Sequence, residues 1–286
     1  MNKRTLIERL LIFFIGLPLS LALVAFLPQK NHLAVNILIT IFCALGAVEL
    51  SGMLKKKGLG LRRVEAAILG AATPLAMTLL VSFHVDSMII PILLMGSASW
   101  LLVSRIFLSE KKLDDAIVGI SAGFTVILYP SLFFSWIILM NRLPDSDYLI
   151  IAFLCIVMVN DSLAWAFGII FGKNNRGIIA VSPNKSIVGF IAGLVSSALV
   201  GIGLALLLPN AFTSARFPPI VSGLVLGFLT GIAAVLGDLA ESAIKRSAGV
   251  KDSGFVIPGR GGVLDSIDSL SLAAPVYYIV YRLLFV

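Results

Sequence analysis

Nine long apolar stretches most strongly constrain what this chain can fold into. Each contains about 20 mostly apolar residues, the length that an α-helix needs to cross the hydrocarbon core of a bilayer. The stretches cover residues 6–27, 33–54, 66–84, 88–108, 116–140, 149–171, 186–208, 219–244 and 266–286. Strands of a membrane barrel would instead appear as segments of about ten residues with alternating polarity. We therefore predict an all-α integral membrane protein with about nine transmembrane helices.

The composition excludes the water-soluble alternatives. Hydrophobic residues make up 59% of the chain and charged residues 13%. In soluble domains, roughly 45–50% of residues are hydrophobic and about 25% are charged. With a mean hydropathy of +1.04, too little polar surface exists to cover a soluble globule of this size. Cys43 and Cys155 stand in apolar runs without the spacing of a metal or redox motif, which argues against a disulfide scaffold.

The basic residues alternate between successive connections, and this alternation predicts the orientation. The N-terminal segment and the second, fourth, sixth and eighth connections hold 18 of the 22 Lys and Arg residues. Lys and Arg accumulate on the cytoplasmic side of membrane proteins. We therefore expect a cytoplasmic N-terminus and an external C-terminus. The accumulation of Lys and Arg on one side of the membrane accounts for the net charge of +7. We therefore expect no nucleic-acid partner.

Carboxylates inside the predicted helices indicate a functional site, because charges within a membrane are costly. The eighth predicted helix carries four polar residues on one face, at i, i+3, i+4 and i+7: Asp238, Glu241, Ser242 and Lys245. Asp265 and Asp268 share a face at the start of the ninth helix, and Glu49 and Asp161 fall in the same cytoplasmic half. Without His or Cys, such a cluster resembles an oxygen-lined site for a hard cation such as Mg²⁺. The simpler alternative is that Glu241 only pairs with Lys245 and that the others cap helix ends or extend to the membrane surface.

Two groups of glycines carry different predictions. Gly223, Gly227 and Gly231 are spaced by four residues, which favours close packing against another helix. The run P-G-R-G-G at 258–262 does not match the nucleotide-binding GxxxxGK[ST] pattern. Its glycines would still permit close backbone approach to a ligand, and Arg260 offers a planar fork that can pair with phosphate.

Two stretches of the chain form recognisable motifs. Residues 237–269 contain G-D-L-A-E-S-A-I-K-R, then K-D-S-G, then I-P-G-R-G-G-V-L-D-S-I-D-S. Upstream stand N-D-S-L-A-W at 160–165, F-G-K at 171–173 and S-P-N-K-S at 182–186. Together they resemble the signature of the phosphatidate cytidylyltransferases, also called CDP-diacylglycerol synthases, which runs S-x-x-K-R-x4-K-D-x-G and P-G-H-G-G-x-x-D-R-x-D. The resemblance covers roughly residues 150–286.

The resemblance implies a reaction and a setting. CTP and phosphatidic acid would give CDP-diacylglycerol and pyrophosphate, a step of phospholipid biosynthesis, at the cytoplasmic face of the cell inner membrane. Mg²⁺ would be required, with a monovalent cation such as K⁺ suggested beside it, and the enzyme would be a homodimer surrounded by membrane lipids. We expect residues 1–115 to form a scaffold or dimer region. Residues 116–286 would form the catalytic region, with a cytoplasmic loop at 245–265.

The resemblance also implies roles for individual residues. The expected catalytic residues are Asp265, Asp268, Lys245, Arg246, Lys251 and Asp252. The residues expected to bind substrate are Asp161, Lys173, Ser182, Lys185, Ser242, Arg260, Gly261 and Gly262. The expected metal ligands are Asp238, Asp265 and Asp268.

Three positions depart from the family pattern. Arg260 stands in place of the usual His, Ser266 in place of Arg, and Val188 in place of Glu. Because one guanidinium is kept but moved by six residues, we hypothesise that Arg260 makes the phosphate contact of the displaced Arg.

Two other functions fit some of the same features. A related CTP-dependent lipid kinase would transfer the γ-phosphate and release CDP. An ion-coupled transporter would also contain buried acids and glycine-broken helices. The sequence shows no internal repeat, and its acids stop in the predicted cytoplasmic half, which disfavours the transporter.

Overall fold

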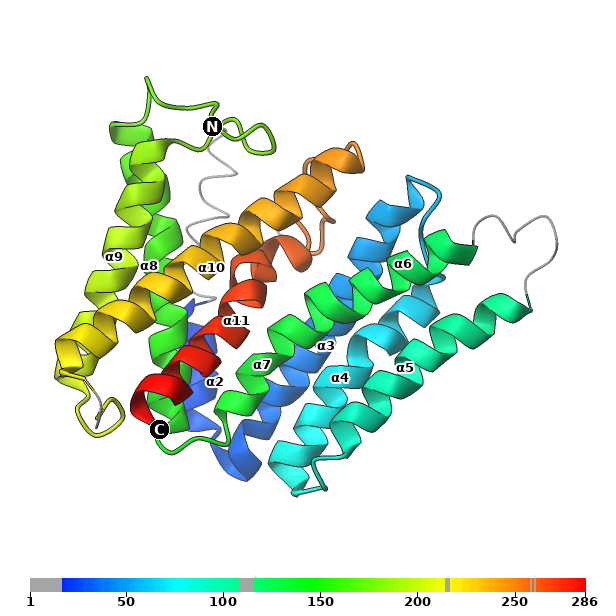
Figure 1. Cartoon of the computed structure of the whole chain (residues 1–286), viewed down its shortest axis with the longest axis horizontal. Coiled ribbons are helices and arrows are strands. Elements are labelled where there is room, and N and C mark those ends of the chain that lie inside the picture. Colours follow the sequence, from blue (N-terminus) through cyan, green and yellow to red (C-terminus); the bar gives the residue numbers. More distant parts are fainter. Residues whose placement is uncertain (1–16, 108–115, 214–216, 258, 260) are drawn as a thin grey trace. The chain divides into compact units, whose positions relative to one another are not determined.

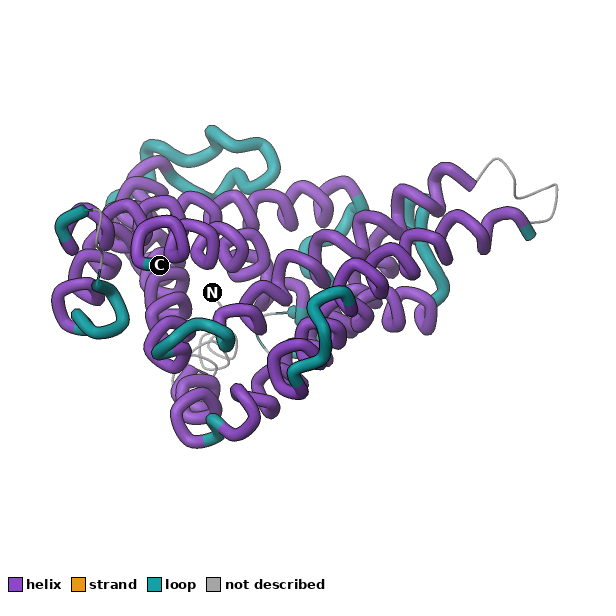
Figure 2. The backbone as a smooth tube through the Cα atoms, turned by 60° about the horizontal axis from the view of Figure 1, so that its bottom comes forward, coloured by secondary structure: helices purple, strands orange, loops and turns teal. Residues whose placement is uncertain are grey.

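The computed structural model describes residues 17–107, 116–213, 217–257, 259 and 261–286. The elements in these residues are all helices (Figure 1; purple in Figure 2). They are α2 (Leu17–Phe26), α3 (Gln29–Lys55), α4 (Arg63–Phe83), α5 (Ile89–Ile106), α6 (Ala116–Val126), η3 (Ile127–Phe133), α7 (Phe134–Met140), α8 (Ser146–Ile170), α9 (Ile187–Leu207), α10 (Pro219–Ser247) and α11 (Leu264–Phe285).

Seven helical stretches of the described chain are long and apolar enough to cross a membrane, with α6, η3 and α7 counted as one. They coincide with the second to eighth predicted spans. Of the first prediction, residues 6–16 lie outside the described residues, and α2 covers most of the rest. The ninth corresponds to α11, which is helical but is not among the seven. The all-helical, multi-pass membrane prediction is confirmed, and the orientation stays a prediction.

The described chain divides into two compact units. The first unit contains residues 1–142 and 247–267, and the second contains residues 143–246 and 268–286. The boundary predicted at residue 115 is a division by function, and it stays a prediction. We describe each unit by itself.

In the first unit, α3 and α4 pack along each other, and α5 and α6–η3–α7 pack against α4. A Cβ atom added at Gly70 on α4 would lie 2.4 Å from the Cβ atom of Ala47 on α3, so the two helices cross closely. The helix of residues 116–140 widens to a π-helical segment at Ile127–Phe133 around Pro130. Proline removes a backbone donor and clashes with the preceding turn, which accounts for the irregular segment.

In the second unit, glycines bring α9 and α10 together. A Cβ atom at Gly227 would lie 2.1 Å from the carbonyl oxygen of Ser197, and one at Gly223 would lie 2.5 Å from that of Gly201. Since backbone atoms cannot move aside cheaply, only glycine fits at these positions. The prediction that the spaced glycines of the eighth span serve helix packing is confirmed.

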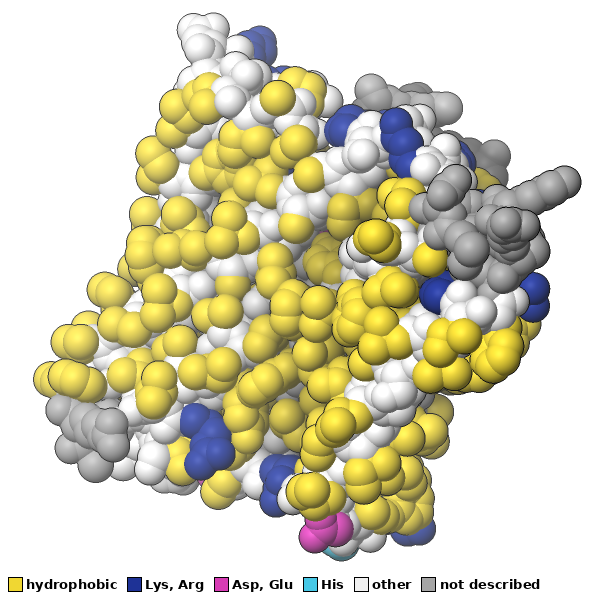
Figure 3. All heavy atoms as spheres, turned by 45° about the vertical axis from the view of Figure 1, so that its right-hand side comes forward, with side chains coloured by type: hydrophobic (Ala, Val, Ile, Leu, Met, Phe, Trp, Pro, Cys, Tyr) yellow, Lys and Arg dark blue, Asp and Glu magenta, His cyan; other side chains and the backbone are white. Residues whose placement is uncertain are grey.

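Large apolar side chains remain exposed along the helices. On α3, Ile37 and Ile41 are each 48% exposed, and Leu45 follows at the same spacing. Hydrophobic side chains cover most of the face in Figure 3, with few charged side chains among them. A soluble protein seldom exposes so large an apolar surface. Hydrocarbon solvates such side chains well, so these surfaces suit the lipid-facing side of a membrane protein.

Candidate functional site

A carboxylate on α3 caps the start of α11 in the first unit. Glu49 Oε1 accepts the Val263 N–H at 3.0 Å, and Glu49 Oε2 accepts the Leu264 N–H at 2.8 Å. The first amides of a helix have no acceptor within the helix. A negative charge there is also stabilised by the positive end of the helix dipole. Glu49 therefore fixes the point where the loop after α10 turns into α11.

Asp265 is held by the same loop. Its Oδ2 atom accepts three hydrogen bonds: from the Ser253 N–H at 2.8 Å, the Ser253 hydroxyl at 2.8 Å and the Gly262 N–H at 2.7 Å. The Ser253 hydroxyl also lies 3.0 Å from Glu49 Oε2, so the two carboxylates share its single proton. We call Glu49, Ser253 and Asp265 the loop cluster.

Glycines close the loop around this cluster. A Cβ atom at Gly262 would lie 2.3 Å from Glu49 Oε2, and one at Gly261 would lie 2.5 Å from Asp265 Oδ2. Gly261 also has a φ of +110°, a backbone conformation that residues other than glycine rarely adopt. Ile257 and Gly261 form an antiparallel bridge next to Gly262. In the described residues, the close backbone approach predicted from these glycines is thus to the protein's own carboxylates.

In the second unit, the predicted polar face of α10 forms two ion pairs. Asp238 pairs with Lys185 from the loop before α9, and it also accepts a hydrogen bond from the Ser242 hydroxyl at 3.4 Å. Glu241 is fully buried and pairs with Lys245, one helical turn further on. The pairing of Glu241 with Lys245 that the simpler alternative predicts is therefore confirmed. The structure brings three predicted site residues together at Asp238.

Asp268 lies where α11 crosses α10. A Cβ atom at Gly237 would lie only 2.4 Å from the Asp268 carbonyl oxygen, so the backbones nearly touch beside Asp238. The charges of Asp238, Asp161 and Lys245 all act on the Asp268 carboxylate. Helices α8, α10 and α11 therefore bring three carboxylates within electrostatic range of one another. Like charges at short range repel unless cations lie among them.

The loop between α8 and α9 folds back on itself to present Lys185. The Lys185 N–H donates to the Ser182 carbonyl oxygen at 3.1 Å. Ser186 then caps α9, because its hydroxyl oxygen accepts the Gly189 N–H at 3.1 Å. Lys173, at the other end of this loop, is exposed.

The remaining predicted site residues are placed as follows. Lys251 and Asp252 are exposed on the loop after α10, and Arg246 is exposed near the end of that helix. Arg260 lies outside the described residues.

In the described residues, no group of three or more His, Cys, Asp and Glu side chains is arranged to hold a metal ion. The donor chemistry nevertheless fits Mg²⁺, which binds oxygen ligands and often uses only one or two protein carboxylates with substrate phosphates and water. Asp265 belongs to the first unit and Asp238 to the second. The sharing of one ion by Asp238, Asp265 and Asp268 therefore stays a prediction.

The sequence placed Glu49 among the acids of the predicted cluster but indicated none of its partners, and it did not single out Ser253. For Glu49, the signal in the sequence was that this acidic residue stands in an apolar stretch with no basic residue one helical turn away. Its partners lie 204 to 215 residues further along the chain. Only the fold reveals such a pairing.

One known protein family matches nearly the whole chain. The model of the cytidylyltransferase family matches residues 7–284. The chain belongs to the cytidylyltransferase family. The resemblance read from the two motifs is thereby confirmed, and the match extends over the N-terminal helices as well.

Curated members of the family are similar to this chain over 45–64% of its length. A phosphatidate cytidylyltransferase from Synechocystis is 43% identical over 136 residues, which are 47% of this chain and 43% of the relative. One from Staphylococcus saprophyticus is 32% identical over 185 residues, 64% of this chain and 66% of the relative. The chloroplastic phosphatidate cytidylyltransferase 5 of Arabidopsis thaliana is 39% identical over 129 residues, 45% of this chain and 30% of the relative. The chain thus covers less than two thirds of each of these relatives.

Proposed function

We propose that this member of the cytidylyltransferase family is a phosphatidate cytidylyltransferase, converting CTP and phosphatidic acid to CDP-diacylglycerol and pyrophosphate. The family match over residues 7–284 carries the proposal. Relatives that bear this name and are 32–43% identical support it. The arrangement of carboxylates and lysines agrees with such a reaction. No specific observation favours the lipid kinase or the transporter.

The proposed reaction transfers the cytidylyl group of CTP to the phosphate of the lipid. An oxygen of the lipid phosphate attacks the α-phosphorus of CTP, the bond from that phosphorus to the bridging oxygen breaks, and pyrophosphate leaves. Such transfers depend mainly on positioning and on neutralising charge. The side chains of Lys173, Lys185, Arg246 and Lys251 supply positive charge for the phosphates. Arg260 is proposed to add a bidentate contact.

We assign the metal ligands to Asp238, Asp265 and Asp268. Bound Mg²⁺ would neutralise phosphate charge and orient the leaving group. Glu49 and Ser253 act as positioning residues, because the hydrogen bonds of Ser253 to Asp265 hold that carboxylate at the start of α11. The Lys185–Asp238 pair keeps a cation beside the second carboxylate until substrate phosphate arrives.

The substrates suggest the setting. CTP is water-soluble and phosphatidic acid is a membrane lipid, so the site belongs at a membrane surface. We propose the cytoplasmic face of the cell inner membrane, a homodimeric assembly, and a monovalent cation such as K⁺ beside the magnesium.

The metal assignment is tested by Asp265→Asn, which keeps the shape of the side chain and removes its charge. We expect cytidylyl transfer to be abolished at saturating Mg²⁺, while the protein inserts and purifies normally. Mg²⁺ should also raise the thermal unfolding temperature of the wild type but not of the variant. Near-normal turnover by the variant would refute the metal assignment.

The proposed function itself is tested by adding phosphatidic acid to the purified protein with CTP and Mg²⁺. Release of pyrophosphate that depends on the lipid is expected, and chelation of the metal should stop it. Lipid-dependent release of CDP would instead indicate the kinase.

A further inference from the structure

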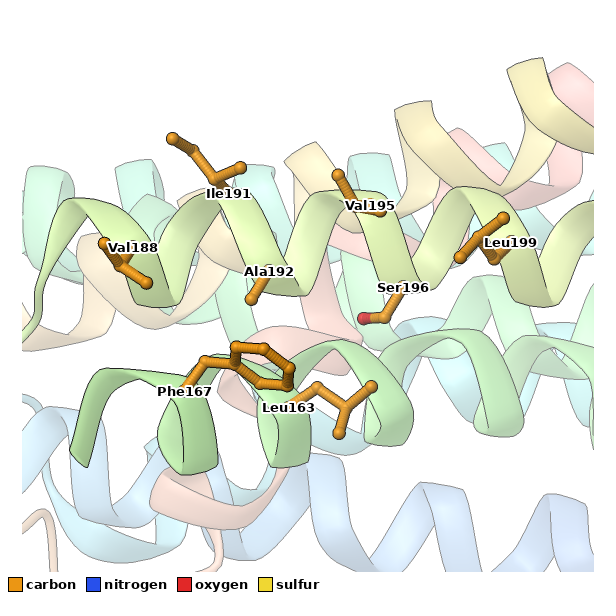
Figure 4. Close-up of a pocket in the computed structure, with 8 residues that line it drawn as sticks. All are labelled: Leu163, Phe167, Val188, Ile191, Ala192, Val195, Ser196 and Leu199. Carbon is orange, nitrogen blue, oxygen red and sulfur yellow. The ribbon is translucent and has the colours of Figure 1, made fainter. Parts of the chain in front are cut away.

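An apolar groove runs along the outside of the second unit between α8 and α9 (Figure 4). Its volume is about 380 Å³, within the roughly 300–1,000 Å³ typical of ligand pockets. Eight residues line it: Leu163, Phe167, Val188, Ile191, Ala192, Val195, Ser196 and Leu199. They come from one face of each helix, and Val188 is one of the three departures from the family pattern.

The groove offers a ligand only hydrocarbon. Its one polar side chain, Ser196, is buried, and its hydroxyl donates to the Gly193 carbonyl oxygen at 2.7 Å. That bond satisfies the hydroxyl within α9. Ala192 and Ser196 are the small residues of the lining and point toward α8, where Leu163 and Phe167 lie, whereas Ile191 projects away from α8 (Figure 4).

The length of the groove matches one leaflet of a bilayer. From Val188 to Leu199 the groove follows α9 for about 16 Å, at about 1.5 Å per residue. The hydrocarbon core of a bilayer is about 30 Å thick, so a single leaflet contributes about half of that. A chain lying in this groove would therefore extend from the membrane surface to about the bilayer midplane.

Positive charge gathers at one end of the groove. Phe167 and Val188 are its lining residues nearest to the loop that joins α8 to α9. That loop carries Lys173, Arg176 and Lys185, of which the first two are exposed. A ligand with a hydrocarbon tail in the groove would thus place an anionic head beside these cations, where phosphate–Lys and phosphate–Arg contacts are strong.

We propose that the α8–α9 groove binds one acyl chain of an anionic phospholipid, with its phosphate at the loop of residues 171–186. Only the identity of the lipid rests on the proposed function: if the protein is a phosphatidate cytidylyltransferase, the lipid is its acceptor substrate, phosphatidic acid. The second acyl chain remains in the surrounding bilayer. Lipid enters sideways from the membrane, with its phosphate already close to Lys185 and Asp238.

The first test is photolabelling in vesicles. A phosphatidic acid analogue that carries a diazirine on its acyl chain should label peptides of α8 and α9. Ala192→Phe fills the groove and should reduce this labelling at least fivefold. The matched control is Ala98→Phe, at a half-buried alanine on α5 in the first unit, and it should leave the labelling unchanged. Equal labelling of the two variants, or labelling confined to other helices, would overturn the proposal.

The second test separates the tail from the headgroup in turnover. Ala192→Phe should raise the KM for dioleoyl phosphatidic acid about tenfold and leave the KM for the dihexanoyl lipid unchanged. Val195→Trp, at a half-exposed position, gives a second filling variant should the first fail to fold. An equal effect on both lipids would contradict the proposal.

The outcomes also distinguish the two proposals. Labelling of the groove in a wild-type protein that releases no pyrophosphate would refute the proposed function and retain the lipid site. Turnover that neither filling variant changes would retain the function and refute the groove. Cross-linking of two chains through Val195→Cys, with no lipid labelling, would show that a second copy covers the groove and would also refute the proposal.

Discussion

Replacing Glu49 by glutamine should loosen the start of α11. The carboxylate accepts the Val263 N–H, the Leu264 N–H and the Ser253 hydroxyl, and glutamine has only one oxygen to offer. At least one backbone amide then loses its acceptor, and a hydrogen bond to a charged group contributes about 1.5–3 kcal/mol. A local loss of about 2 kcal/mol corresponds to about a 30-fold change in an equilibrium constant, since about 1.4 kcal/mol is tenfold.

Hydrogen–deuterium exchange followed by mass spectrometry measures this change directly, because the Val263 and Leu264 amides are themselves the reporters. Their peptide should exchange about 30-fold faster in Glu49→Gln, since local opening governs exchange. Glu65→Gln is the control: Glu65 pairs with Arg105 in the same unit, and its loss should leave that peptide unchanged. Less than a threefold acceleration in Glu49→Gln would refute the capping role.

Three further predictions follow from other parts of the chain. Gly237→Val should lower the unfolding temperature by several degrees and impair activity, because overpacking costs about 1–3 kcal/mol. Its matched control is Gly203→Val, at a position where an added Cβ atom has no neighbour within 4 Å. Equal effects of the two substitutions would refute the close crossing. Arg260→Ala should reduce cytidylyl transfer at least tenfold and Ser266→Ala far less, whereas equal, mild losses would refute the phosphate contact. Reporter fusions at the two chain ends should lie on opposite sides of the membrane, and the same side would refute the orientation.

The sequence predicted the helices well because membrane spans are set by apolar length. Burial in lipid requires every backbone group to be paired within the helix, so a long apolar run leaves little choice of structure. The start at residue 33 agrees with the backbone, since Lys30, Asn31 and His32 have positive φ angles and regular α3 begins after them. The widening at Pro130 was not predicted, because a proline in a membrane helix can be accommodated in several ways.

The candidate site was predictable only where its residues lie close together in the sequence. The spacing of Glu241 and Lys245 within one helix was enough to suggest their pairing. The pairing of Lys185 with Asp238 spans 53 residues, and that of Glu49 with the loop spans more than 200. Such contacts depend on which helices become neighbours. Local periodicity carries no information about that choice.

The fate of labelled CTP tests the proposed chemistry most directly. Purified protein in vesicles of phosphatidic acid would be given Mg²⁺ and CTP labelled at either the α- or the γ-phosphorus. Cytidylyl transfer predicts that the α-label enters the lipid and the γ-label leaves as pyrophosphate, in equal amounts. Appearance of the γ-label in the lipid with release of CDP, or no lipid-dependent transfer of either label, would contradict the account.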